Sequence, residues 1–304
     1  MALRADRETG AGDSISACLV VRNEEAVIDR CLGSLDGVVD EIVLVHDGEC
    51  EDRTLEIAGR YGCRIFVRPL VGHAEVATVF AYEQAQGEWI LTLDADEYLS
   101  EPLRQQLRTL VTDEGVNGYE FLWRIWNGRR HVTSKGPFRR SLFRRSRVHV
   151  LGMMHAVERV DPPVRRMWLE LEHRSLYDNF SLRAMLGKHR RWARINAREF
   201  LGELADLPSF NWDGPVRWPP RRRLLNRLSP LLFLPYFPVV LVVSLGGASA
   251  YAGPRVNLRL AFSQAVYAST VQFYVAKYTY FGIGERDLQA ASERPRPSAV
   301  ERGG

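Results

Sequence analysis

The chain of 304 residues has 41 lysines and arginines against 37 aspartates and glutamates, a formal net charge of +4, and 46% hydrophobic residues. This length and composition suit one large globular domain, or one domain with a substantial appendage. The mild charge and the absence of a recognised nucleic-acid module argue against nucleic-acid binding. Acids predominate at 23–52 and 94–101 and arginines at 124–227, which indicates a basic surface facing phosphates or a membrane.

The N-terminal stretch 1–14, MALRADRETGAGDS, has no apolar core. It is therefore not expected to be a secretory signal, and we predict a disordered lead-in. From Ile15 onward, apolar β-rich runs alternate with segments whose apolar residues are spaced helically. The strands are predicted at 15–21, 41–46, 63–69 and 88–93, and the helices at 26–35, 53–62 and 74–86, with Asp52 as a cap and Gly62 as a stop. This alternation predicts an α/β fold with a parallel sheet covered on both faces.

Polar clusters follow each of the four predicted strands, namely Arg22–Glu25, His46–Glu51, Arg68–Glu75 and Asp94–Glu97. Ligands of parallel sheets gather at the carboxyl ends of the strands, so these clusters predict one binding edge. No GxGxxG follows the first strand and no GxxxxGK[ST] is present, which disfavours a dehydrogenase or a P-loop enzyme. Any nucleotide would then be bound through acids and a metal.

The pattern changes after Leu110. The stretch GYEFLWRIWNGRRHV predicts a strand or hairpin, and GPFRRSLFRRSRVHVLGMMHAVERV also has β character. Asn179 is a plausible cap for a long helix that ends near Leu204. Basic residues recur on this helix at steps of three or four, and they either form a binding stripe or a solvated face: Arg183, Lys188, Arg191, Arg194 and Arg198.

An uncharged apolar segment occupies residues 228–254. It is long enough to cross a bilayer, but Pro230, Pro235 and Pro238 are expected to break up its first half. A re-entrant or interfacial segment fits better, next to the basic flank Arg221–Arg223 and Arg227. The apolar, aromatic stretch that follows could lie in the membrane interface, the alternative being a buried core segment. The tail from 284 to 304 is predicted to be disordered.

All four cysteines, Cys18, Cys31, Cys50 and Cys63, lie in the first quarter of the chain without a CxxC pair. This favours reduced cysteines in the cytoplasm over a disulfide framework or a zinc site.

The stretch WILTLDADEYLS places Asp94, Asp96 and Glu97 directly after an apolar strand. Buried unpaired carboxylates are costly, so acids at this position need a cation or solvent nearby. Two carboxylates one residue apart can converge on Mg²⁺ or Mn²⁺, which prefer oxygen ligands and leave positions for phosphate oxygens. The strand context therefore predicts a metal–diphosphate site.

These residues resemble a known family. The run from CLVVRNEEAVIDRCLGSL through DEIVLVHDGECEDRTLEIAGRYG to GEWILTLDADEYLS is similar to the donor half of family-2 glycosyltransferases with the GT-A fold. Farther on, SLFRRSRVHVLGMMHAV and LEHRSLYDNFSLRAMLGKHRRWARIN resemble the branch of lipopolysaccharide-core glucosyltransferases. The resemblance implies a Rossmann-like, mostly parallel sheet flanked by helices. It also implies inverting transfer of a sugar from a nucleoside diphosphate, with Mg²⁺ or Mn²⁺.

By this resemblance Asn23, Glu24 and Asp47 hold the nucleoside, Asp94 binds the ribose or the metal, and Asp96 is the principal metal ligand. The chain departs from the family where paired acids usually precede the glycine, because His46–Asp47 stands there. This leaves the identity of the base open.

A second departure concerns the catalytic base. Where the branch commonly has His–Glu, this chain has His155–Ala156. Single displacement needs a base for the acceptor hydroxyl, and the candidates are His155, Glu158 and Glu97.

Arginines that could clamp a donor diphosphate or an acceptor phosphate form two pairs, Arg139–Arg140 and Arg144–Arg145, and we assign Arg144 to the donor. Lys188 and Arg191 could act in the same way, and His73 and Glu75 could line the donor pocket.

The expected organisation is a lead-in (1–14), a nucleotide-sugar-binding half (15–112), an acceptor-side half with a basic helix (113–205), a helical membrane-associated region (206–283) and a tail (284–304). The predicted function is transfer of a sugar to a lipid-linked or cell-envelope glycan at the cytoplasmic face of the cell membrane. Two alternatives stay open, a non-catalytic membrane adaptor and a sugar-nucleotide nucleotidyltransferase. The latter is disfavoured because the loop RNEEAVID has no glycine.

Overall fold

The computed structural model describes residues 13–176, 178, 181, 185–201, 207–212, 224, 228–248 and 254–283. Several sequence predictions lie outside these residues: the lead-in before residue 13, the tail after residue 283, the cap Asn179, and the arginines Arg183, Arg221–Arg223 and Arg227.

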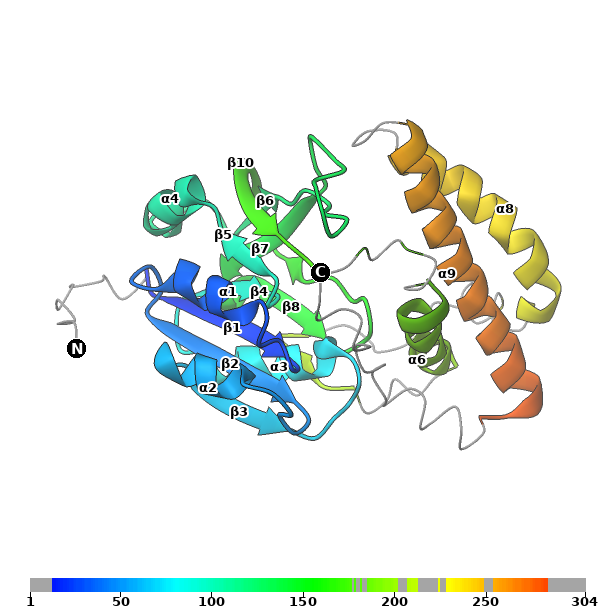
Figure 1. Cartoon of the computed structure of the whole chain (residues 1–304), viewed down its shortest axis with the longest axis horizontal. Coiled ribbons are helices and arrows are strands. Elements are labelled where there is room, and N and C mark those ends of the chain that lie inside the picture. The colour runs from blue at the N-terminus through cyan, green and yellow to red at the C-terminus, as the bar shows by residue number, and fades with distance from the viewer. Residues whose placement is uncertain are drawn as a thin grey trace.

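A mixed eight-stranded sheet forms the centre of the protein, with the strand order β3-β2-β1-β4-β7-β6-β10-β5 (Figure 1). Its strands are β1 (Ile15–Val21), β2 (Glu41–Asp47), β3 (Arg64–Arg68), β4 (Trp89–Leu93), β5 (Glu97–Leu99), β6 (Gly118–Leu122), β7 (Phe138–Arg144) and β10 (Val164–His173). The first four strands are parallel, as the sequence pattern predicts. Strand β7 runs antiparallel to both β4 and β6, so the second half of the domain extends the same sheet in mixed directions.

Helices cover both faces of the sheet. Alternate residues of β1 separate the two cores, since successive side chains of a strand point to opposite faces. Ala17 and Leu19 pack with α1 (Ile28–Leu35), α2 (Thr54–Arg60) and α4 (Glu101–Val111), whereas Cys18 packs with α3 (Ala74–Gln84). The predicted α/β architecture is therefore present, with carboxyl ends of the parallel strands gathered at one edge.

The ends of α2 show how local sequence sets these elements. The sequence predicts Asp52 as the cap, but Arg53 holds the N-cap position without a side-chain cap bond; Asp52 Oδ1 instead accepts from the backbone N–H of Thr54, the first helical residue, at 2.9 Å. Gly62 follows the helix with φ of +67°, a left-handed conformation that glycine adopts without strain.

A smaller sheet in the order β11-β8-β9 lies on the α3 side. It contains β8 (Val148–Leu151), β9 (Arg159–Val160) and β11 (Ser209–Phe210), and a 3-10 helix, Arg145–Arg147, leads into β8. The loop between β8 and β9 carries His155 and Glu158 to the carboxyl edge of the main sheet.

The C-terminal part is helical, with a π-helical turn (Met185–His189), α6 (Arg190–Phe200), α8 (Ser229–Ala248) and α9 (Pro254–Phe281). Figure 1 shows α8 and α9 side by side, with α6 between α9 and the sheet. Ala193 and Ala197 of α6 pack against Val271 and Val275 of α9 in a separate apolar cluster. The basic stripe predicted on α6 is not simply a solvated face. Arg191 is buried, and Arg190 Nε donates to Tyr274 Oη of α9 at 2.9 Å.

The prediction that prolines break up the apolar segment is wrong. Helix α8 continues through Pro235 and Pro238 to Ala248, and Pro230 lies in its first turn, where no helical N–H is needed. An interior proline costs a helix about 3 kcal/mol. Contact with α9, including an edge-to-face pair between Phe237 and Phe262, offsets that cost. Within the residues described, neither α8, α9 nor any other helix combines the length and apolarity needed to span a bilayer.

Candidate active site

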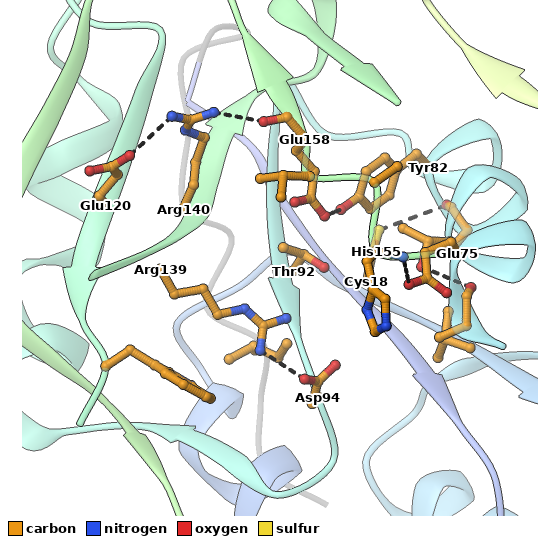
Figure 2. Close-up of a pocket in the computed structure, with 18 of the residues that line it drawn as sticks. Cys18, Glu75, Tyr82, Thr92, Asp94, Glu120, Arg139, Arg140, His155 and Glu158 are labelled. Carbon is orange, nitrogen blue, oxygen red and sulfur yellow. Dashed lines mark hydrogen bonds and ion pairs between the residues drawn. The ribbon is translucent and has the colours of Figure 1, made fainter. Parts of the chain in front are cut away.

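A pocket of about 630 Å³ opens at the carboxyl end of β4. Strands β1, β4 and β7, helix α3 and the β8–β9 loop all contribute to its wall. Its polar side chains include Tyr82, Asp94, Arg139, Arg140, His155 and Glu158 (Figure 2). The pocket therefore combines carboxylates, guanidinium groups and a histidine from both halves of the domain.

The two predicted metal ligands follow β4 but face different partners. Asp94 lines the pocket with a side chain that is 59% exposed, and its Oδ2 accepts a hydrogen bond from Arg139 Nη1 at 2.8 Å. Asp96 Oδ2 lies 3.4 Å from Nε2 of His173, a buried residue of β10. Desolvation in the pocket raises the pKa of Asp94, but the charge of Arg139 outweighs that effect and leaves this pKa lowered. Asp94 therefore lines the pocket with a lowered pKa, whereas Asp96 does not line it and faces His173 instead.

These acids fit a divalent cation by their chemistry. Asp96 has a carboxylate at the sheet edge with an imidazole beside it, and Asp94 keeps a second oxygen that Arg139 does not contact. Mg²⁺ and Mn²⁺ sites that bind substrate phosphates use one or two protein carboxylates and leave their other positions to phosphates and water. The residues present thus suit an ion bound chiefly through Asp96.

A second group of potential ligands lies elsewhere. His131, Glu170 and Glu172 hold ligand atoms within 4.8 Å of one another. Arg124 donates two hydrogen bonds of 2.6 Å to Glu170, and Arg174 pairs with Glu172 at 3.0 Å. Since guanidinium groups already neutralise both carboxylates, we assign no metal to this group.

Glu97 does not lie in the pocket, which corrects its prediction as a catalytic base. Its side chain is fully buried and accepts hydrogen bonds from Trp123 Nε1, from the backbone N–H of Asp94 and from Arg139. Burial raises its pKa to about 7 despite the opposing charge of Arg139. Strand β5 pairs with β10, and this pairing turns the Glu97 side chain into the protein. Glu97 therefore stabilises the turn that contains Asp94 and does not contact a sugar acceptor.

Glu158 does line the pocket. Its Oε1 accepts a hydrogen bond from Tyr82 Oη at 3.1 Å, and its backbone carbonyl accepts one from Arg140 Nη1 at 2.6 Å (Figure 2). Arg140 is in turn held by Glu120 at 3.0 Å. Burial raises the pKa of Glu158 above its ordinary value. A pocket carboxylate of increased basicity is suited to accept a proton.

His155 also lines the pocket, but its ring is engaged outside it. Nε2 lies 2.9 Å from Tyr267 Oη of α9, and the ring meets Trp192 edge-on with centroids 5.2 Å apart. Desolvation by these neighbours lowers the pKa of His155. Of the two bases that the sequence ranks equally, the geometry favours Glu158.

The residues predicted to hold the nucleoside lie at the same edge, in the loops after β1 and β2, and do not line this pocket. Asn23 Oδ1 accepts from Glu51 N–H at 3.0 Å, and Glu24 N–H donates to Thr54 Oγ1 at 2.7 Å. Asp47 is buried and accepts from the N–H groups of residues 71 and 72 at 2.9 and 3.3 Å. These contacts tie together the loops that follow β1, β2 and β3.

Arg144 lies away from the site, which corrects its assignment to the donor. It is paired with Trp89 at the start of β4, and its guanidinium donates to the carbonyls of Val116 and Asp113. Because β7 is antiparallel to β4, the end of β7 meets the start of β4, roughly 17 Å along the strand from Asp94. The same reversal brings the first arginine pair, Arg139–Arg140, to the pocket.

Sequence reasoning missed Tyr82, Trp123 and Tyr267. None stands in a recognisable motif, and Tyr267 is 112 positions from the histidine that it contacts. His173 was within reach, since it is the histidine of the quoted LEHRSLYDN stretch, yet it carried no predicted role.

Comparison with known proteins relates part of this chain to one family. The family model for Glycosyl transferase family 2 matches residues 16–155. An uncharacterized glycosyltransferase of Rickettsia felis is 34% identical over 107 residues, which are 35% of this chain and 37% of that protein. The lipopolysaccharide core biosynthesis glycosyltransferase LpsC of Rhizobium meliloti is 34% identical over 118 residues, covering 36% of this chain and 41% of LpsC. The aligned segments thus span well under half of these relatives.

A solved structure of residues 1–349 of S. aureus TarS in complex with UDP-GlcNAc is 15% identical to this chain, with a TM-score of 0.45, over 88% of this chain and 91% of that chain. This likeness is too low to transfer a ligand or a reaction. The family match covers β1 to the β8–β9 loop, and therefore both the acids after β4 and His155. Residues 16–155, within a GT-A-like α/β fold whose mostly parallel sheet is flanked by helices, thus match the model of glycosyltransferase family 2.

Proposed function

We propose that this protein transfers a sugar, with inversion, from a nucleoside-diphosphate sugar to a lipid-linked or cell-envelope glycan. The observation that carries the proposal is the pocket at the end of β4, where Asp94 and Arg139 lie across from Glu158. Acids beside a basic group suit a diphosphate and its counter-ion, and a separate carboxylate suits the attacking hydroxyl.

In the proposed reaction the acceptor oxygen forms a bond to the anomeric carbon while the bond from that carbon to the diphosphate oxygen breaks. The departing diphosphate keeps the electron pair, and a divalent cation bound at Asp96 would neutralise its charge. Glu158 takes the hydroxyl proton as the acceptor attacks. Tyr82 holds the carboxylate through Oε1, and Arg140 fixes its backbone, so the base is held before substrate binds.

The envelope acceptor is supported by the likeness to LpsC, which is named as a lipopolysaccharide core biosynthesis glycosyltransferase. It is also supported by an exposed apolar surface on α8 and α9. Val239, Val242 and Val243 of α8 are 58–69% exposed, at the i, i+3, i+4 spacing of one helix face.

Helix α9 continues this surface. Leu258, Phe262, Phe273 and Tyr280 are between 44% and 62% exposed and, at 100° per residue, fall within about 60° of arc. Arg255 lies in the first turn of the helix, where it suits anionic headgroups, whereas Arg259 is paired with Asp178 at 2.7 Å. We propose that this surface, Val239–Val243 with the α9 stripe, lies on the cytoplasmic face of the cell membrane beside a lipid-anchored acceptor.

The domain division proposed from the sequence follows the same assignment of roles. Residues 15–112 would bind the donor, 113–205 the acceptor, and 206–283 the membrane. The first two parts share one sheet, so the pocket lies at the seam between β4 and β7.

The test of the enzymatic proposal is a panel of nucleoside-diphosphate sugars, incubated with the full chain and Mn²⁺, Mg²⁺ or a chelator. We expect release of nucleoside diphosphate that needs the metal and falls at least a hundredfold in Asp96→Asn. Normal turnover in Asp96→Asn would remove the metal assignment. Donor binding without turnover across a broad acceptor panel would favour the adaptor instead.

The membrane proposal is tested by flotation with phosphatidylglycerol and phosphatidylcholine vesicles. We expect binding to the anionic vesicles that is lost when Val242 and Val243 are both replaced by Asp. Val67→Asp is the matched control, because Val67 is 53% exposed on β3, away from α8 and α9. Equal binding by the double variant and the control would refute the docking surface.

A further inference from the structure

The β8–β9 loop, residues 152–158, brings Glu158 into the pocket, yet its own conformation is costly. His155 has φ of +59°, in the left-handed region that a non-glycine residue seldom occupies. Such a conformation costs about 1–3 kcal/mol and persists where surrounding contacts determine it. The contacts that hold His155 therefore decide where the loop places Glu158.

Two carboxylates hold the backbone of this loop. Glu199 Oε1 of α6 accepts a hydrogen bond from the N–H of Met154 at 2.9 Å, and Glu75 Oε1 of α3 accepts one from the N–H of His155 at 2.6 Å. His73 bridges the two acids, with Nδ1 3.0 Å from Glu75 and Nε2 3.9 Å from Glu199. Consecutive N–H groups of the loop are thus bound from opposite sides.

A third contact comes from the C-terminal helix α9. Tyr267 Oη lies 2.9 Å from Nε2 of His155 and accepts a hydrogen bond from Asn196 Nδ2 of α6 at 3.1 Å. The Asn196 bond uses the hydroxyl as an acceptor and leaves its proton available to a second partner, and His155 Nε2 lies within hydrogen-bond distance of it. The ring of Trp192 meets the same imidazole edge-on, with ring centroids 5.2 Å apart. The left-handed residue is therefore fixed at both its backbone and its ring.

We infer that Tyr267 is a positioning residue for the transfer reaction. Through His155 it holds the loop that presents Glu158 to the acceptor hydroxyl. Helix α9 is then part of the active site as well as the proposed membrane surface, although it lies outside residues 16–155 that match the family. This inference rests on the proposed function, because it gives Tyr267 a role in that reaction.

The variant that tests it is Tyr267→Phe, which keeps the ring contacts and removes the hydroxyl. Tyr61→Phe is the matched control, because it also removes one hydroxyl, which donates to Asp29 at 3.0 Å and does not line the pocket. We expect kcat to fall about tenfold in Tyr267→Phe, with the donor KM unchanged, since small displacements of a reacting group lower rate without altering donor contacts. The control should leave both values unchanged.

A double-mutant cycle separates positioning through His155 from a general loss of packing. If Tyr267 acts through the imidazole, Tyr267→Phe combined with His155→Gln should be no slower than His155→Gln alone. Additive losses would overturn the inference, because they would show that the two side chains act independently.

A readout that does not need activity is the NMR spectrum of protein labelled at methionine and histidine. In Tyr267→Phe we expect shifts of the Met154 and His155 amide signals and of the His155 Nε2 signal, and none in Tyr61→Phe. Unchanged loop signals would overturn the inference even if kcat fell. If the wild-type chain transfers no sugar, the proposed function fails, and the loop signals still decide whether Tyr267 positions the loop.

Discussion

Replacing Glu158 by Gln is the most direct test of the proposed chemistry. Gln has nearly the same shape, its amide oxygen can still accept from Tyr82 Oη, and the backbone bond from Arg140 does not involve the side chain. The pocket wall should therefore persist while the proton acceptor is lost. General-base assistance contributes about 10²- to 10⁴-fold to a rate, so we expect kcat for transfer to fall by at least a hundredfold. The donor KM should be unchanged.

The pH profile adds an independent expectation. Only the ionised carboxylate can take the acceptor proton, so kcat/KM should rise with pH with unit slope and level off above the pKa of Glu158. Burial raises that pKa, which places the midpoint above the ordinary value of 4.5. In Glu158→Gln this limb should disappear. A raised pKa also makes the carboxylate a stronger base once it is ionised.

The assay is release of nucleoside diphosphate with and without acceptor, together with donor binding by calorimetry. Glu120→Gln is the matched control, because it removes one carboxylate from the same pocket, where Glu120 holds Arg140. A Glu158→Gln variant that keeps transfer within tenfold of wild type, with an unaltered pH profile, would refute the assignment of the base.

Three further outcomes follow from particular contacts. Arg139→Ala should lower transfer at least tenfold, whereas Arg144→Ala should leave the donor KM within twofold, measured by diphosphate release. Gly87→Ala should destabilise the fold by about 1–3 kcal/mol in urea unfolding, because the new Cβ would lie 2.7 Å from the backbone nitrogen of Ser16. Burial raises the pKa of Glu199 to about 7, above the 4.5 of the unfolded chain, so stability should be full below pH 4.5 and fall up to about pH 7. Glu199→Gln should flatten that dependence in unfolding measured at several pH values.

The donor half was predictable because its signals are local. The apolar run at 15–21 and the Gly62 stop each act within a few residues, and the structure has both, although Arg53 rather than Asp52 holds the N-cap position. The position of the binding edge was predictable for the same reason. Parallel strands bring their carboxyl ends, and with them Asp47 and Asp94, to one edge of the sheet.

The acceptor half depended on contacts that no local pattern encodes. The sequence FRRSLFRR offers two equivalent arginine pairs, and the antiparallel direction of β7 alone decides that Arg139 rather than Arg144 meets the acids. The prolines of the apolar segment led to a wrong prediction for the same reason. Packing of α8 against α9 outweighs the tendency of proline to interrupt a helix. Glu97 was misjudged because a three-residue strand turned it inward.

His46 shows what a departure from the family pattern can mean physically. The ring is fully buried between two loops, with Nδ1 2.7 Å from the carbonyl of Gly48 and Nε2 3.3 Å from the N–H of Asn23. A carbonyl can only accept and a backbone N–H can only donate, so the geometry requires a neutral ring with its proton on Nδ1. This histidine therefore joins the loops after β1 and β2 where the family usually has an acid.

Replacing His46 by Ala should leave the Asn23 N–H and the Gly48 carbonyl without these bonds. An unsatisfied buried group costs about 1–3 kcal/mol, so urea unfolding should show a loss of at least that size. The loop after β1 should also loosen, and donor affinity measured by calorimetry should fall by tenfold or more, because Asn23 lies on that loop. Thr54→Ser is a suitable control, since it keeps the hydroxyl that accepts from Glu24 in the same loop cluster. Unchanged donor affinity in His46→Ala would show that the loops after β1 and β2 do not bind the nucleoside of the donor.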